Sequence, residues 1–187
     1  MGNRVKYGLC DVHISKITVN NDGTFNYGTP FAIPGAVSLT LDAEGDEANF
    51  SADNNAKYFT TYANNGYSGS LEMAIYTEKF RTDILGETTD TNGALVENKD
   101  DTISDFALGF QIDGDSANRR FWLYSVSAAR PSTSSQTIEN SKEPVTDTLN
   151  ITATARLTDG AVKVFMEKSQ SNAAAYEGFF TAVYEAQ

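Results

Sequence analysis

The chain has 187 residues, and its 14 Lys and Arg against 25 Asp and Glu give a formal net charge of −11. This length predicts one domain over 1–187, and the acidic balance argues against broad binding to DNA or to an anionic membrane, since like charges repel. With 40% hydrophobic and 21% charged residues, no run of about 20 apolar residues and no apolar secretory signal at the start, the composition predicts a folded protein made in a cytoplasm.

Alternation of apolar and polar residues, which is typical of strands with one buried face, recurs along the chain. A turn at Gly45-Asp46 is expected to join two of these segments into one hairpin over 37–53. In chain order the predicted strands run over 12–18, 37–44, 47–53, 70–75, 105–113, 121–126, 148–155 and 162–167.

Two segments favour short helices. Thr77 is a candidate N-cap for one or two helical turns that end at Gly86. Asn172 is a candidate N-cap for a second helix over Ala173–Val183, in which Tyr176, Phe179, Phe180 and Val183 recur at helical spacing.

Three long stretches are rich in turn residues and are predicted to be loops, over 20–35, 86–104 and 129–147. Loops of this length are either solvated or available for contacts between subunits. The predicted fold class is therefore mainly β, a β-sandwich with one or two short flanking α-helices and long loops.

Patterns for catalysis or metal binding are weak. His13, the single histidine, follows Cys10 by three residues; in a strand these positions face opposite sides, and together they supply only two of the ligands of a structural zinc. The segment 66–70 lacks the second glycine of a nucleophile elbow, and 88–99 lacks the first and last ligands of a calcium loop. The expected protein has no catalytic residue, cofactor or metal, although a hydrolase with a pair of acids remains an alternative.

Charge is distributed unevenly along the chain. Between Ile17 and Ala56 there is no Lys or Arg, and the segment contains six acids: Asp22, Asp42, Glu44, Asp46, Glu47 and Asp53. Of these, Asp42, Glu44, Glu47 and Asp53 are expected on the polar face of the hairpin at 37–53. The face is either an ordinary solvated surface or the wall of a negatively charged channel, along which phosphates are repelled rather than held.

A series of short motifs, in a fixed order, covers essentially the whole chain. The segments are 7–13, 27–30, 33–37, 52–54, 69–72, 84–86, 106–110 and 176–184. Their order and spacing resemble the major tail tube proteins of long, non-contractile-tailed bacteriophages. No single motif is specific, and Ser51 stands where an aromatic residue is expected.

The resemblance implies a tail-tube-type β-sandwich that forms a homohexameric ring, with rings stacked into the tail tube of the virion after synthesis in the bacterial host cytoplasm. The four acids of the hairpin would face the lumen, and DNA would pass through it without specific binding. The implied partners are other copies of the chain and the tape measure, terminator and distal tail proteins, with no membrane.

Two alternatives to a tube subunit remain open. A β-sandwich module that binds carbohydrate or a host surface is compatible with 9 Tyr and 11 Phe. A related tail component, such as a terminator or distal ring protein, is compatible with the same architecture.

Overall fold

The computed structural model describes residues 5–20, 24–114, 118–137 and 144–186, and these are mainly β. The strands are β1 (Leu9–Val19), β2 (Phe25–Tyr27), β3 (Phe31–Ala32), β4 (Ala36–Glu44), β5 (Glu47–Ala52), β6 (Asn55–Tyr62), β7 (Gly66–Met73), β8 (Thr88–Thr89), β9 (Leu95–Val96), β10 (Phe106–Ile112), β11 (Arg119–Ala128), β12 (Asp147–Thr154) and β13 (Lys163–Met166), and the helices are α1 (Glu78–Asp83) and α2 (Ala173–Glu177). The mainly β class with two short helices is confirmed.

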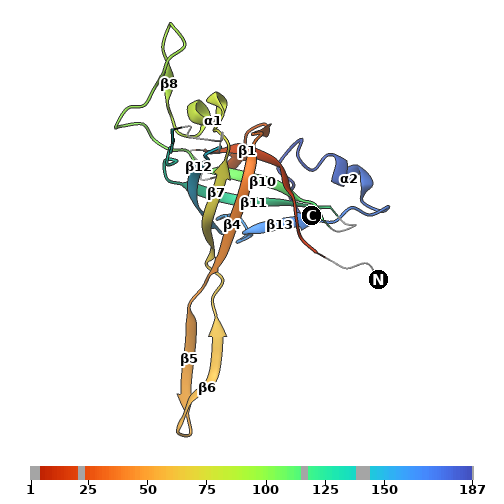
Figure 1. Cartoon of the computed structure of the whole chain (residues 1–187). Helices are drawn as coiled ribbons and strands as arrows, with labels where there is room; N and C mark the ends of the chain where they lie inside the picture. Colours follow the sequence, from red (N-terminus) through yellow and green to blue (C-terminus); the bar gives the residue numbers. More distant parts are fainter. Residues whose placement is uncertain (1–4, 21–23, 115–117, 138–143, 187) are drawn as a thin grey trace.

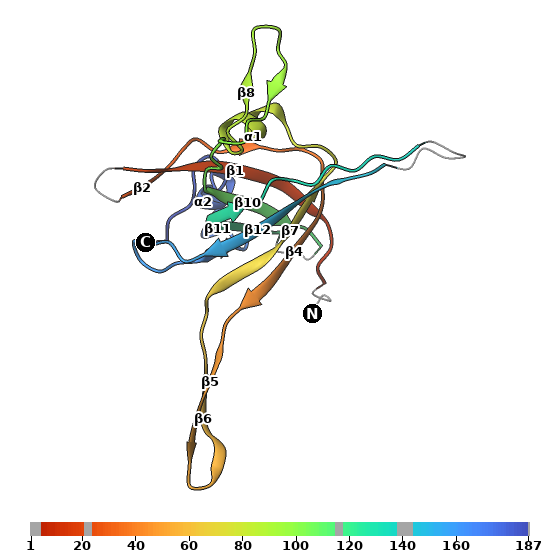
Figure 2. The same ribbon diagram turned by 90° about the vertical axis from the view of Figure 1, so that its left-hand side faces the viewer.

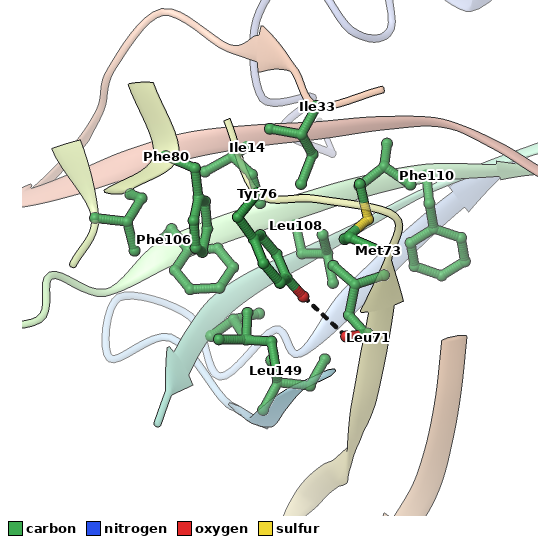
Figure 3. Close-up of a cluster of buried hydrophobic side chains, with 14 of the residues drawn as sticks. Ile14, Ile33, Leu71, Met73, Tyr76, Phe80, Phe106, Leu108, Phe110 and Leu149 are labelled. Atoms are coloured by element: carbon green, nitrogen blue, oxygen red, sulfur yellow. Dashed lines mark hydrogen bonds between the residues drawn. The ribbon is translucent and has the colours of Figure 1, made fainter. Parts of the chain in front are cut away.

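One antiparallel sheet forms the body, in the order β2-β1-β10-β11-β12-β7-β4, with β13 beside β11 and β3 beside β1. The sheet curls so that its two ends approach one another, which is consistent with a β-sandwich. Buried side chains from β1, β7, β10, β12 and α1 meet in one cluster inside the curl (Figure 3). Tyr76 also reaches into this cluster, and its hydroxyl donates a hydrogen bond to the Leu71 carbonyl at 2.9 Å.

The C-terminal segment covers part of the opposite face of the sheet. Trp122 and Tyr124 of β11 are buried there against Phe179 and Val183. Gly109, on the neighbouring strand, leaves room for the indole, because a Cβ at this position would lie 2.8 Å from Trp122 Cζ3. The aromatic residues at the end of the chain therefore form a second, smaller core.

The helix predictions are partly confirmed. Thr77 caps α1 as predicted, since its hydroxyl accepts a hydrogen bond from the Phe80 N–H at 3.3 Å. The predicted length of the second helix is wrong, because α2 ends at Glu177 and the chain continues in turns. Asn172 makes no side-chain cap, and its amide instead donates to the Glu167 carbonyl at 2.8 Å.

Most predicted strands are present, and the predicted long loops contain additional short ones. The loop at 20–35 contains β2 and β3, and the loop at 86–104 contains the β8–β9 hairpin. The strand β6 was not predicted at all. The prediction of a turn at Gly45-Asp46, between β4 and β5, is wrong, as described below.

Several segments project from the body. The β5–β6 pair extends from one end and the β8–β9 hairpin from the opposite end (Figures 1 and 2). Residues 129–137 and 144–146 run side by side away from the sheet (Figure 2). A bridge between Ser132 and Thr148 of β12 and a hydrogen bond from the Ser134 hydroxyl to the Thr146 carbonyl at 3.2 Å hold them together. In the described ranges no helix has the length and apolar character needed to cross a membrane.

Candidate assembly surfaces

The predicted hairpin at 37–53 is instead the outward half of a much longer ribbon. The backbone does not reverse at Gly45-Asp46, because the hydrogen-bond ladder continues through it: Asn65 N–H donates to the Glu44 carbonyl at 2.9 Å and Ala63 N–H to the Asp46 carbonyl at 3.0 Å. Glycine is needed at position 45 because the two strands approach each other closely there, and not because the chain turns. A Cβ at this position would lie 1.9 Å from the Ala63 oxygen.

The ribbon reverses at Asp53-Asn54. Both residues have positive φ, 49° and 56°, and they connect the paired residues Ala52 and Asn55. Positive φ at both central residues is the geometry of the two-residue turns that suit the twist of a hairpin. The strand β6 then returns beside β5, and β7 beside β4. We call the outer part of this ribbon, Glu47–Tyr62, the arm.

The four acids predicted to line a channel lie along this ribbon and are all exposed. Asp42 and Glu44 lie on the same side of β4, two residues apart, opposite Ser68 and Gly66 of β7. The Glu44 carboxylate accepts a hydrogen bond from the Ser68 hydroxyl. Glu47 begins the arm and Asp53 lies in its turn, so the acids form a line rather than a cluster. Asp22 lies outside the described residues.

The stretch without Lys or Arg between Ile17 and Ala56 suggested that no basic residue lies beside these acids, and this is wrong for Glu47. Lys57 Nζ lies 2.5 Å from Glu47 Oε1, and Asn49 and Tyr62 donate to the same carboxylate. The ammonium of Lys57, followed by the amide of Asn49, lowers the pKa of Glu47. Lys57 comes directly after the segment that is free of basic residues, and the return of β6 brings it back over β5.

A broader polar surface adjoins these acids. In β12 the residues alternate strictly, with one set buried in the core and the other facing away from it. In β7 and β4 the same alternation continues from a register shift between Ala36 and Ser38, although Leu39 and Leu41 on the core side of β4 are only half-buried. The outward set continues onto the end of β11 and contains no Lys or Arg. We call it the polar face, and it consists of Ser38, Thr40, Asp42, Ser68, Ser70, Glu72, Ser125, Ser127, Thr148, Asn150, Thr152 and Thr154.

The polar face ends at an edge strand. Within the described residues β4 is the last strand of the sheet and pairs on one side only, with β7. Val37 on this strand is 52% exposed. An uncovered edge strand presents unpaired backbone groups to which another strand can add.

The arm carries large exposed aromatic side chains. Phe50 and Phe59 are directly opposite one another on β5 and β6 and are 61% and 60% exposed. Tyr58 and Tyr62 are 60% and 70% exposed. An isolated two-stranded hairpin is marginally stable in water, and clustered exposed aromatics usually mark a contact surface.

An apolar depression opens at the end of the body from which the arm leaves. Two adjoining hollows of ≈ 400 Å³ and ≈ 370 Å³ share Lys6, Ile112, Phe121 and Lys163 in their walls. The ring centroid of Phe121 lies 4.9 Å from that of Phe110 and 5.7 Å from that of Phe165. We call this depression the aromatic trough, and its remaining principal walls are Leu39, Leu41 and Tyr67.

Cys10 and His13 do not form a dyad. The Cys10 thiol donates to Asp113 Oδ2 at 3.4 Å, and burial, followed by this hydrogen bond, raises its pKa to about 11. The His13 ring stacks on Phe180 at 4.5 Å and its Nδ1 lies 2.8 Å from the Asp11 carbonyl. No group of three or more His, Cys, Asp or Glu suited to a metal ion occurs among the described residues.

The strand over 148–155 was predicted from the Thr and Asn at every second position, and β12 confirms it. The joining of its polar residues with those of β4 and β7 into one face was not predicted, nor were the exposed aromatic residues of the arm. The run Tyr58–Tyr62, rich in aromatic and β-branched residues, was a signal for β6. What the sequence did not indicate is that these segments would lie beside the acids of β4 and β5.

No protein-family model matches the chain, and no curated protein matches it. Among solved structures, the fold is similar to that of a chain in the cryo-EM structure of the anti-feeding prophage cap, a tube terminating cap, with a TM-score of 0.45 and 7% sequence identity. The match covers 90% of this chain and 97% of that chain. A similarity at this level carries no functional argument, so function is inferred from the surfaces described above.

Proposed function

We propose that the chain is a structural subunit of a phage-type tail tube, which acts by self-assembly and without catalysis. The observation that carries this proposal is the polar face, a smooth sheet surface without Lys or Arg that ends at the uncovered edge strand β4. Such a surface suits the wall of a conduit, and such an edge suits the joining of one subunit to the next.

Strand joining explains how a small sandwich makes a hollow object. If β4 of each copy pairs with an edge strand of its neighbour, the contact is heterologous, and a heterologous contact closes into a ring when its rotation permits. We propose six copies in each ring, as the resemblance to major tail tube proteins implies, with rings stacked into a tube. Pairing would also remove the exposed edge that a free subunit presents.

The polar face would then line the lumen. Asp42 and Glu72 give it negative charge, and Glu44 extends this charge at the end of β4. The Ser, Thr and Asn side chains around these acids carry no charge. Phosphate groups are repelled by such a wall and find no cation to hold them, which favours passage of DNA over binding. Virion tail location and contacts with tape measure, terminator and distal tail proteins belong to the same proposal.

Electron microscopy of the concentrated protein tests assembly directly. Rings or tubes are expected, with a central channel, and their mass in sedimentation should grow in multiples of one ring. A chain that remains monomeric at every concentration, including in the presence of its tail-assembly partners, would contradict the proposal.

The role of charge is tested separately, in tails built from this chain. Neutralising the two acids of the polar face together, with D42N and E72Q, should leave tubes intact and slow DNA ejection. A matched control neutralises two exposed acids elsewhere, Glu78 and Asp100. Equal ejection rates in the two variants would count against a lumenal position for the polar face.

A further inference from the structure

We propose that the arm of one copy docks into the aromatic trough of a second copy, with Phe50 and Phe59 filling the depression. This inference rests on the proposed function, because it names the contact through which the subunits assemble. It is independent of strand joining at β4, and it uses two surfaces that strand joining leaves unexplained.

Among the described residues, the arm is covered by no other part of its own chain. Every residue from Glu47 to Phe59 is exposed except Ala52, which is half-buried. Glu47, Asn49 and Thr60 hydrogen-bond with one another through their side chains, so the polar groups of the arm are largely satisfied locally. The phenyl rings of the Phe50–Phe59 pair make no such contacts and remain open to water.

The trough has the complementary chemistry. Its aromatic floor, formed by Phe110, Phe121 and Phe165, is suited to edge or offset stacking with further rings. Phe110 and Phe121 are stacked, and Phe165 is tilted against Phe121. Phe165 is 55% exposed, so the row of three rings ends at the surface with one ring uncovered. Its size of ≈ 400 Å³ is that of pockets which bury compact apolar groups.

The arm cannot reach the trough of its own chain. Leu41 and Tyr67, at the root of the ribbon, are walls of the trough. From there the ribbon continues away from the body to the turn at Asp53-Asn54 (Figures 1 and 2). The two strands stay paired from the root to the turn, with one register shift between Phe50 and Ala52, and this pairing opposes folding back of the arm. The occupant must therefore come from another molecule.

Charge identifies that molecule as a second copy. Lys6 and Lys163 lie in the walls of both hollows, and Lys163 Nζ lies 4.2 Å from the centroid of the Tyr67 ring. The arm and its root carry Glu44, Asp46, Glu47 and Asp53 against one cation, Lys57. Opposite charge at the rim guides two surfaces into register, while the buried rings supply most of the affinity.

Removal of the two rings tests the donor side. The variant F50S/F59S should raise the critical concentration for assembly about 100-fold, as measured by sedimentation, because two central aromatic anchors are lost. The matched control I75S/L157S removes two other exposed apolar side chains, 66% and 85% exposed, and should assemble as the wild type does. An unchanged critical concentration in F50S/F59S, with wild-type tubes forming normally, overturns docking and leaves the proposed function standing. A wild type that never assembles overturns both.

A cross-link tests the pairing itself and does not depend on how well a serine variant folds. One copy carries F59C and another carries F165C, both in the background C10S. A disulfide-linked dimer is expected only when the two are mixed under mild oxidation, and charge reversal with K163E should reduce its yield. A copy carrying I75C in place of F59C serves as the control. A yield no greater than that of the control overturns the proposal.

Discussion

The indole Nε1 of Trp122 donates a hydrogen bond to the carbonyl oxygen of Phe179 at 2.8 Å, and both residues are almost completely buried. Next to it, the Tyr124 hydroxyl donates to the Tyr184 carbonyl at 2.9 Å. Two consecutive outward side chains of β11 thus hold the irregular C-terminal segment by its backbone. Because the segment forms only five residues of helix, these side chains satisfy carbonyl groups that a longer helix would have paired internally.

The substitution W122F should reduce the free energy of unfolding by about 3 kcal/mol. It leaves the buried Phe179 carbonyl without a donor and opens a cavity where the indole was. Urea unfolding followed by circular dichroism measures the loss. F165L, at an exposed position on the same sheet, should change the value by less than about 1 kcal/mol. A loss of similar size in both variants would show that the hydrogen bond is not the cause.

The substitution G45A should disrupt the ribbon locally. The added methyl group would overlap the Ala63 carbonyl oxygen, so the strands must separate where the ribbon leaves the body. Amide exchange in 47–62 should accelerate at least about 10-fold while the core amides of β10 and β11 keep their protection. D46A, one residue further along, should leave amide exchange unchanged both in 47–62 and in the core strands. Uniform loss of protection throughout the chain would contradict this local effect.

Substitutions of Arg81 and Glu87 should have strongly non-additive effects on the free energy of unfolding. The Glu87 carboxylate is only 2% exposed, and Arg81 Nη1 lies 3.1 Å from its Oε1. R81M should cost about 3 kcal/mol because it leaves a buried carboxylate unpaired, whereas R81M/E87L should cost less than R81M alone. A double-mutant cycle by urea unfolding measures the difference. Additive losses would refute the coupling.

Cys10 should react slowly with thiol reagents. With its pKa raised to about 11, about one molecule in a thousand carries the reactive thiolate at pH 8. The reaction rate should rise about tenfold for each pH unit up to about pH 10, without a plateau. D113N, which removes the charge that opposes ionisation, should speed the reaction at pH 8, and D11N should do so less. Equal rates in the two variants would exclude the Asp113 hydrogen bond as a major cause.

The strands of the body could be predicted because their alternation is local. In β12 each residue's burial follows from its own position in a period of two. In β10 the predicted strand is present, but both of its faces are buried. The cap at Thr77 could be predicted for the same reason, since it depends on a contact three residues away. The length of α2 could not, because the aromatic spacing of Phe179 and Phe180 is satisfied by packing on Trp122 without a helix.

The path of the ribbon could not be predicted from local signals either. Glycine at 45 indicated a turn, but it is required by Ala63, which approaches from eighteen residues further along. The true turn at Asp53-Asn54 contains no glycine and relies on two residue types that tolerate positive φ. Consequently Asp42, Glu44 and Glu47 were correctly assigned to strands, but Asp53, predicted in a strand, lies in the turn. The length of the ribbon and the compensation of Glu47 by Lys57 were missed.

The pairing of the two ribbon strands from the body to the turn at Asp53-Asn54, with one register shift between Phe50 and Ala52, has a mechanical consequence. A pull on the tip, directed along the ribbon, is transmitted to β4 and β7 along their own length. The hydrogen bonds between β7 and β12 then resist in shear, all at once, and cannot be opened one after another. A contact made at the tip can thus transmit tension into the middle of the sheet. The projecting ribbon is therefore suited to hold neighbouring subunits together under load.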